Sequence, residues 1–592
     1  MIQTPSPIVV EVSAANRACP LHAAAGGSPS EVPIEAGAWS VGDLLLIAPQ
    51  AVDGVHAVSQ RLAPAHSAKA ALWRLALAGG HHATHPAEAE AEARAWLTSP
   101  GLDDPKLVDL VNVPFVTIDN AGSRDLDQAV HVQREGDGYR LRYALADASY
   151  YVRPGSALFT EALRRGTSYY MPGVAIPMLP RCLSEGLVSL NPKEERRSLV
   201  MDLLLDAEGR CTKTALLRAR IRSRAKLTYA GVQAMYAAGE NHPNAHQSYA
   251  KSLILLAVVG RLRIELARQA DVVSFQRTEV DVQIDGASFS LVADHRLPIE
   301  RYNEQISLLC NMEGARLIAP QDGDAQGVFK VHPAPPSEKL ERFVRLVDAL
   351  VKARGLEPDR WRWHRGREPL ADYLDRLPRA GDDARLSQAI ERQAMMANVG
   401  STFADSPALH HGVGAAAYAR FSAPMREVVG VFTHKEALEQ VGLAAPCDRA
   451  ADEQLRLQVI EAANSARQRQ SKLTKACNQL VLDTLMAREL RMGTRQRWRT
   501  GTLLGMSATK IYLQLDAPPV EIKVYLRDLP RDGARPRVSA HGGCFTLGER
   551  SIALGERVEV RVTGRSERSG RWAFSLRFPD SPQPGNDAAT LS

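Results

Sequence analysis

Three aspartates within nine residues, placed where an apolar run ends, constrain this chain more than any other feature. The apolar segment 115–118 leads into Asp119, the polar segment 120–124 follows, and Asp125 and Asp127 come next. A strand that delivers one carboxylate, a tight loop and two further carboxylates supply the oxygen ligands that Mg²⁺ prefers. The alternative is that these residues only form turns, which Asp, Asn and Gly favour. The spacing alone leaves both interpretations open.

The segments that flank the aspartates carry specific motifs. They read TIDNAGSRDLDQA over 117–129, YALADASYYV over 143–152, SYYMPG over 168–173 and IPMLPRCLS over 176–184. This run, from about residue 110 to 204, resembles the ribonuclease II (RNB) family of 3′→5′ exoribonucleases. Weaker matches, VFKVH at 328–332 and APMR at 423–426, extend the resemblance over residues 109–486.

The resemblance implies an α+β fold with several domains. A chain of 592 residues also exceeds the roughly 250–300 residues at which single cores stop growing. We expect a small β-rich barrel with helices over 1–105, an RNB-type catalytic domain over 106–490 and an S1-type OB-fold barrel over 493–578. Residues 579–592 have the composition of a disordered tail.

The activity implied by the resemblance is hydrolysis of single-stranded RNA from its 3′ end to nucleoside 5′-monophosphates. Mg²⁺ is the implied cofactor, with Mn²⁺ as the alternative ion, and no organic cofactor is expected. The implied metal ligands are Asp119, Asp125, Asp127 and Gln128, and the implied catalytic residues are Asp125, Asp127 and Arg426. Paired divalent ions clamp the attacking and leaving oxygens of an in-line displacement, and a guanidinium stabilises the charge that develops on the phosphate.

Contacts to RNA are also implied. The resemblance places Tyr170 against the terminal base, while Arg181 and Arg196 are either contacts to the RNA backbone or structural ion-pair formers. In the C-terminal domain, aromatic residues alternate with arginines, as in domains that stack bases over a basic groove. Most of these aromatics should be core, and the candidates for stacking are Tyr512, Tyr525 and Trp572.

Four positions depart from the family pattern. The family's fourth aspartate is Gln128 here, a neutral ligand that should weaken cation binding. The basic run after the family arginine is replaced by 427–430, a late-helix glutamate aligns near Thr474, and the partner of the stacking tyrosine aligns near Gln326. A catalytically attenuated or inactive RNA-binding protein is therefore a second hypothesis. A metal phosphoesterase for a small substrate is a third, which the basic C-terminal region disfavours.

The hydrophobic pattern predicts secondary structure in all three regions. It predicts N-terminal strands at 8–12, 43–47 and 57–62, helices at 69–77, 87–97, 249–270, 337–354 and 455–491, and C-terminal strands at 501–506, 510–515, 521–526, 558–563 and 572–576. Between the first two helices, His81, His82 and His85 are either metal ligands or incidental residues of a flexible linker. The second interpretation is favoured because no Cys or acidic partner stands at ligand spacing.

Charge and cysteine content limit partners and compartment. Residues 493–577 carry 16 Lys and Arg against 8 Asp and Glu, whereas residues 1–105 carry 5 against 10. A basic C-terminal region attracts phosphate, although it also suits a merely soluble surface. No apolar run reaches the roughly 18 residues needed to span a bilayer, and no secretory signal is present. The seven cysteines form no C-x-x-C pair, which argues against a zinc ribbon or disulfides. We expect a cytoplasmic protein without membrane contact, and the resemblance suggests a monomer.

Overall fold

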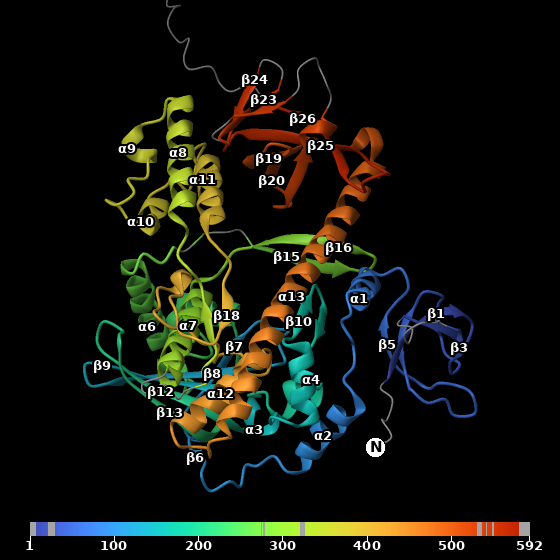
Figure 1. The fold of residues 1–592 in the computed structure, drawn as a ribbon, viewed down its shortest axis with the longest axis vertical. Helices are drawn as coiled ribbons and strands as arrows, with labels where there is room; N and C mark the ends of the chain where they lie inside the picture. The colour runs from blue at the N-terminus through green and yellow to red at the C-terminus, as the bar shows by residue number, and fades with distance from the viewer. Residues whose placement is uncertain are drawn as a thin grey trace, which may run out of the picture.

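The computed structural model describes residues 7–21, 30–273, 275, 279–319, 326–529, 536–539, 542–547 and 550–578. The expected tail, 579–592, lies outside these residues. Helices and sheets are mixed along the whole chain, which confirms the predicted α+β class (Figure 1). Within the described ranges, no helix combines the length and the apolar character that crossing a bilayer requires.

The N-terminal part is an antiparallel sheet followed by two helices. The strand order is β3-β2-β1-β4-β5. The strands are β1 (Ile8–Ala14), β2 (Arg17–Pro20), β3 (Val32–Pro33), β4 (Leu44–Ile47) and β5 (Val58–Ala63), and the helices are α1 (Ala68–Ala78) and α2 (Ala87–Thr98). The three predicted strands and both helices are confirmed, whereas β2 and β3 were not predicted. A small core that includes Val10, Val12 and Leu45 holds the sheet.

A second five-stranded sheet forms the centre of the molecule. Its order is β6-β13-β12-β9-β8, and only β6 runs parallel to its neighbour. The strands are β6 (Val108–Asp109), β8 (Gln128–Glu135), β9 (Gly138–Ala146), β12 (Glu195–Leu205) and β13 (Cys211–Arg222). Successive side chains of a strand point to opposite faces, so Leu199 and Met201 enter one core and Val200 enters another.

Helices cover both faces of this sheet (Figure 1). The core that contains Leu199 is closed by α5 (Tyr229–Ala238), α6 (Ala250–Gln269) and α7 (Pro298–Ile318). The opposite core is closed by α2, α3 (Ala148–Tyr151), α4 (Ala157–Arg165), the π-helix η1 (Cys182–Leu187) and α12 (Val428–Gln440). The predicted helix at 249–270 is confirmed as α6.

Two short strand pairs position the aspartates and the YMPG segment. Strand β7 (Thr117–Asp119) runs parallel to β14 (Lys226–Thr228), with Asp119 opposite Thr228 at the end of the pair. The YMPG segment forms the hairpin of β10 (Tyr169–Met171) and β11 (Val174–Ile176). This hairpin shares a core with α1, with α13 (Arg449–Arg491) and with the hairpin of β15 (Glu279–Asp285) and β16 (Ser288–Asp294).

The C-terminal sheet has the order β21-β20-β19-β25-β26, is antiparallel throughout, and brings its edge strands β21 and β26 into contact. Its strands are β19 (Arg499–Ser507), β20 (Lys510–Leu515), β21 (Glu521–Tyr525), β25 (Arg557–Arg565) and β26 (Trp572–Arg577). All five predicted strands are confirmed within two residues of their ends. A smaller sheet of β22 (Arg537–Val538), β23 (Cys544–Leu547) and β24 (Arg550–Ala553) was not predicted.

The helices next to this sheet share its core. They are α8 (Ser337–Arg354), α9 (Pro358–Trp361), α10 (Leu370–Asp375) and α11 (Ala384–Ala397), and the short pair of β17 (Phe329–Val331) and β18 (Thr402–Ala404) flanks them in sequence. Helix α8 has the predicted bounds. Helix α13 runs from the central sheet to the C-terminal sheet (Figure 1). It starts six residues before the predicted position because the carboxylate of Asp448 accepts a hydrogen bond from the N–H of Ala451 and caps it.

Candidate active site

A cavity of about 280 Å³ opens where β7 ends and β8 begins, against α7 and the segment 420–426. Its walls carry many charged and amide side chains. They include Asp119, Asp127, Gln128, Arg296, Glu300, Asn303, Glu304, Arg420 and Arg426. The cavity therefore gathers carboxylates and guanidinium groups from four parts of the chain that are far apart in sequence.

Asp119 holds the polar loop that follows it. Its Oδ1 accepts hydrogen bonds from the backbone N–H of Asn120 at 2.7 Å and from the hydroxyl of Ser123 at 2.8 Å. The ammonium of Lys226 donates to the carbonyl of Ala121 at 2.9 Å. The loop is thus fixed by its own strand pair, and the half-buried Asp119 carboxylate faces the cavity.

Asp127 is buried and bound on both oxygens. Its Oδ1 accepts from the N–H of Met425 at 2.9 Å, and its Oδ2 accepts from Nε of Arg426 at 2.5 Å. Burial raises the pKa of Asp127 to about 6, although Arg426 and the N–H of Met425 favour the charged form. Burial also opposes the charge on Arg426, but attraction to Asp127 raises the pKa of the guanidinium above its usual value. Arg426 stays a cation.

Asp125 is held by Tyr170 and does not line the cavity. The phenol of Tyr170 donates to Oδ2 of Asp125 at 2.6 Å. Burial and then the charge of Asp125 raise the pKa of Tyr170, so the phenol remains a donor. The ring of Tyr170 is 44% exposed, and its backbone is tied to α13 through the side chain of Gln470.

Gln128 has all of its amide hydrogen-bonding groups directed into the protein side of the cavity wall. Its carbonyl oxygen accepts from the hydroxyls of Tyr143 and Ser307, and its amide nitrogen donates to the carbonyl of Ser422. An amide oxygen has two lone pairs, and two hydroxyls occupy both of them here. The predicted role of Gln128 as a cation ligand does not match these contacts.

Asn311 on α7 was not predicted from the sequence. It is 1% exposed, and its Oδ1 accepts from the backbone N–H groups of Phe421 and Ser422 at 2.8 and 3.0 Å. Its amide nitrogen donates to the hydroxyls of Tyr418 and Ser422. Asn311 thereby fixes the segment that carries Arg426.

A polar face of α7 forms one wall of the cavity, and the sequence analysis also missed it. Glu300 accepts from the N–H of Leu297 at 3.0 Å, and Glu304 pairs with Arg296 at 2.9 Å. The face is traced by residues spaced three or four apart, namely Glu300, Asn303, Glu304, Ser307 and Asn311. This spacing on a largely buried helix is the signal that sequence reasoning could have used.

Arg181 and Arg196 both make protein contacts. The exposed Arg181 pairs with Glu185 and donates to the carbonyl of Ala175 at 2.9 Å. Arg196 donates to the carbonyls of residues 186, 189 and 195 and pairs with Glu194. The side chain of Arg196 is only 13% exposed. Of the two interpretations left open by the sequence, the structural one describes these contacts.

The C-terminal aromatic candidates differ in exposure. Trp572 is 7% exposed, and its indole N–H donates to Asp483 of α13 at 2.8 Å. The expectation that Trp572 offers a stacking surface is therefore wrong, because its ring belongs to the core. Tyr512 and Tyr525 are half-buried, with cationic side chains over their rings.

Trp498 is a further half-buried aromatic of this region that the sequence analysis missed. The guanidinium carbons of Arg561 and Arg577 lie 4.8 and 4.4 Å from the centre of its ring. It therefore has the combination of aromatic surface and positive charge that was sought in Trp572.

The histidines near the N-terminus are structural, and the expected flexible linker is wrong. His85 is 4% exposed, and its Nε2 lies 3.2 Å from the carbonyl oxygen of Met178. His81 is also buried and packs on Tyr169 with 4.2 Å between ring centres. They tie the segment before α2 to the central domain.

The residues around the cavity suit a hard cation by their chemistry. Asp119 and Asp127 line one cavity, Asp125 is close enough to Asp127 to affect its pKa, and all their donors are oxygens. The three carboxylates do not converge within 4.8 Å of one another in this structure. Tyr170 holds one of them and Arg426 another, so a bound cation has to replace those contacts.

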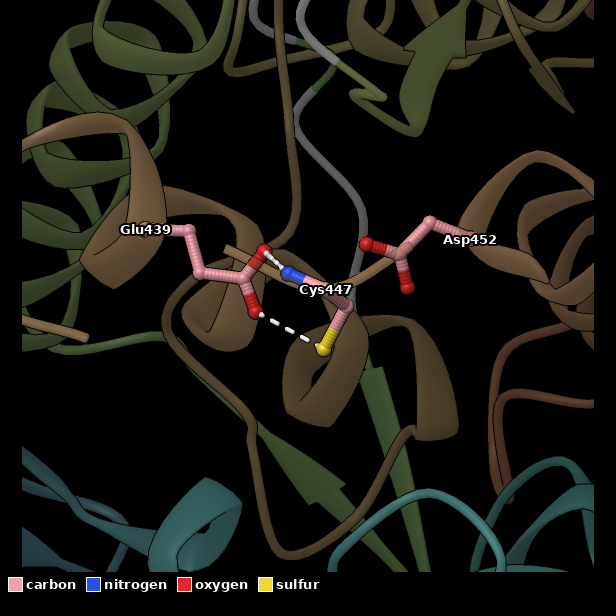
Figure 2. Close-up of side chains that lie close together, drawn as sticks. All are labelled: Glu439, Cys447 and Asp452. Carbon is pink, nitrogen blue, oxygen red and sulfur yellow. Dashed lines mark hydrogen bonds between the residues drawn. The ribbon is translucent and has the colours of Figure 1, made fainter. Parts of the chain in front are cut away.

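Within the described part of the chain, one other group brings three ligand atoms within 4.8 Å. It consists of Glu439, Cys447 and Asp452, where α12 ends and α13 begins (Figure 2). The ammonium of Lys435 lies 2.9 Å from Glu439 and 2.8 Å from Asp452, and it also contacts Glu436 at 2.8 Å. A lysine already neutralises this cluster, so it is an ion-pair network.

Comparisons with known proteins agree on one family. The family model described as RNB domain matches residues 107–436. Ribonuclease R of Vibrio parahaemolyticus is 31% identical over 339 residues, which cover 55% of this chain and 38% of that protein. Exoribonuclease 2 of Serratia proteamaculans is 29% identical over 424 residues, covering 70% of this chain and 62% of that protein. The chain thus spans less than two thirds of the length of either relative.

Solved structures share the fold. The structure of Mycoplasma genitalium RNase R in complex with ribose methylated single-stranded RNA has a TM-score of 0.77 at 16% identity, and the match covers 97% of this chain and 90% of that one. The structure of yeast Ssd1, a pseudonuclease, has a TM-score of 0.58 at 13% identity, covering 91% and 67% of the two chains. Both an RNA-bound nuclease and a pseudonuclease are therefore among the structural neighbours.

Proposed function

The chain belongs to the RNB domain family, and on that premise we propose that it is a 3′→5′ exoribonuclease. Its substrate is single-stranded RNA, its products are nucleoside 5′-monophosphates, and its cofactor is Mg²⁺ or Mn²⁺. The observation that carries the proposal is the cavity in which Asp119, Asp127 and Arg426 meet. A site of this kind combines oxygen ligands for a cation with a guanidinium for a phosphate.

Asp119, Asp125 and Asp127 are the residues that would hold the cation. A bound divalent ion supplies charge stabilisation to the attacking and leaving oxygens of the displacement. Arg426 binds a non-bridging oxygen of the scissile phosphate and stabilises the negative charge that builds up during attack. The N–H of Met425 and the side chain of Arg426 keep the Asp127 carboxylate oriented in the wall of the cavity.

Tyr170 is the proposed stacking partner of the terminal base. Its partly exposed ring stands beside the cavity because its phenol is anchored to Asp125 and its backbone to Gln470. Stacking on an aromatic ring is tolerant of base identity. Tyr512 and Tyr525 in the basic C-terminal region are proposed to contact the RNA further from the 3′ end.

Gln128 and Asn311 are proposed positioning residues. Gln128 links β8 to the carbonyl of Ser422, and Asn311 links α7 to the same segment. That segment ends at Arg426, so both residues act through the placement of its guanidinium. In this proposal the cation has three charged ligands from the chain, and Gln128 is not one of them.

A time course on RNA labelled at its 5′ end tests the proposal. Wild-type protein with Mg²⁺ or Mn²⁺ should shorten the RNA progressively from its 3′ end, and a chelator should stop the reaction. The Asp127→Asn variant should retain RNA binding without shortening the RNA. Internal cleavage by the wild-type protein, or full activity of the variant, contradicts the assignment.

An RNB-fold protein that binds RNA without hydrolysing it is the second candidate. The neutral Gln128, occupied by Tyr143, Ser307 and Ser422, is the observation that favours it. Under this candidate, wild-type protein binds single-stranded RNA but leaves it intact at millimolar Mn²⁺.

A further inference from the structure

A second cavity, of about 310 Å³, adjoins the candidate active site. It is formed by the outer side of α6 and the first turns of α7, and Arg296 lines both cavities. The side chains that give it character are Arg261, Glu265, Arg296, Arg301 and Tyr302. Its volume falls at the lower end of the roughly 300–1,000 Å³ that is usual for small-molecule sites.

A close contact between α6 and α7 fixes the cavity's aromatic side. A Cβ atom on Gly260 would lie 2.5 Å from Cβ of Tyr302, so only glycine permits this approach of the two helices. The approach places the guanidinium carbon of the next residue, Arg261, 6.0 Å from the centre of the Tyr302 ring. An aromatic face and a planar cation therefore stand together in a rigid setting.

The charge of the cavity is positive. Three arginines line it, and its one carboxylate, Glu265, is bound to Arg268 at 2.8 Å and to Gln269 at 3.0 Å. Arg296 pairs at 2.9 Å with Glu304, which lines the active-site cavity. A positive, low-dielectric recess attracts anions, and this one lies directly behind the wall of the site where phosphate chemistry is proposed.

We propose that this second cavity binds a nucleoside 5′-monophosphate. The guanidinium groups of Arg261 and Arg301 bind the phosphate, since two planar forks match its oxygens. The base lies against the ring of Tyr302, because stacking on an aromatic ring accepts every base. The inference rests on the proposed function in one respect: the active site releases a nucleotide of this class next to the shared Arg296.

Calorimetric titration of AMP into the full chain tests the binding site itself. The titration uses the Asp127→Asn background and compares it with the added pair Arg261→Glu and Arg301→Glu, with Arg342→Glu on α8 as the matched control. We expect the pair to weaken AMP binding at least about tenfold, the control to leave it unchanged, and adenosine to bind far more weakly than AMP. Equal AMP affinity with and without the pair overturns the proposal.

A milder variant and a kinetic measurement guard against trivial results. Arg301→Gln keeps the side chain polar and uncharged, and it should weaken AMP binding in the same direction if the doubly charged pair fails to fold. In wild-type protein, added AMP should inhibit hydrolysis of RNA, and the pair should abolish that inhibition. Inhibition that persists unchanged in the pair overturns the proposal, because AMP then acts in the active site.

Two kinetic regimes identify the source of the nucleotide. If the cavity takes the departing product, the pair changes the multiple-turnover rate and leaves single-turnover cleavage unaltered. If it takes free nucleotide, only the response to added AMP changes. Absence of any RNA hydrolysis by wild-type protein refutes the proposed function, and the AMP titration still decides the site.

Discussion

Nε of Arg426 lies 2.5 Å from Oδ2 of Asp127, although 299 residues separate the two in sequence. The carboxylate is almost completely buried, whereas 37% of the Arg426 side chain is exposed. The pair therefore joins a fixed internal anion to a cation that reaches the cavity. Its two members make separable contributions, which substitution can distinguish.

Replacing Arg426 with Gln should impair both stability and activity. Removal of one partner of a buried ion pair leaves an uncompensated charge and costs about 3–5 kcal/mol. Hydrolysis should fall at least about a hundredfold, since a donor to the developing phosphate charge is lost. Urea unfolding and single-turnover cleavage measure the two effects, with Arg345→Gln on α8 as the control. A stable variant with full activity contradicts the proposed role.

Replacing Gln128 with Leu should destabilise the fold without weakening cation binding. The hydroxyls of Tyr143 and Ser307 and the carbonyl of Ser422 lose their partner, and each buried unsatisfied group costs about 1–3 kcal/mol. Thermal unfolding measures the loss, and electron paramagnetic resonance of Mn²⁺ measures the affinity. A tenfold drop in Mn²⁺ affinity in the folded variant would instead make Gln128 a ligand.

The sequence carried enough information for much of the fold. Helix α8 has the predicted bounds because its apolar residues recur at helical spacing and Gly355, with φ of +61°, ends it. The five C-terminal strands alternate in burial and were found for the same reason. Short strands such as β2 and β22 have too few residues to show a period, and they exist only because a neighbouring strand pairs with them.

The candidate site could be predicted only in part. Asp119 and Asp127 lie in one local motif, and the cavity confirms that they share a wall. Asp125 lies in the same motif but turns to Tyr170, which spacing cannot reveal. Asn311 makes contacts with residues about 110 positions away, and long-range pairing of this kind leaves no trace in a single sequence beyond polar residues on a buried helix.

Replacing Asn311 with Ala should lower stability and activity together. The N–H groups of Phe421 and Ser422 would be left buried without an acceptor, which costs about 1–3 kcal/mol for each group. The segment that carries Arg426 then loses its fixed position, so cleavage should slow even under conditions where the variant is folded. Gln479→Ala on the exposed side of α13 is the matched control. Normal cleavage by folded Asn311→Ala would refute the positioning role.

Replacing Tyr170 with Phe should strengthen cation binding. The phenol donates to Asp125, and a cation that uses Asp125 has to displace that hydrogen bond. Bonds to charged groups contribute about 1.5–3 kcal/mol, so the apparent affinity for Mn²⁺ in the absence of RNA should rise about tenfold. Tyr170→Ala gives the same gain but also loses the stacking surface, so it should bind RNA more weakly than Tyr170→Phe. Unchanged Mn²⁺ affinity in both variants would show that Asp125 is not a ligand.

The raised pKa of Asp127 predicts opposite pH effects on activity and on stability. Its value is about 6, compared with an ordinary value of 3.8. Because the ionised form is needed for cation binding, the single-turnover rate should fall about tenfold for each pH unit below about 6. The folded protein holds this proton more tightly than the unfolded chain. The stabilisation from Asp127 is therefore full below pH 3.8 and is lost as the pH rises through about 6. Urea unfolding of wild-type protein and Asp127→Asn between pH 4 and 8 isolates this contribution, since the variant has no titrating group there. A rate that stays constant from pH 5 to 7, or a stability difference that grows in favour of wild-type protein as the pH rises, would contradict burial as the dominant influence on this carboxyl.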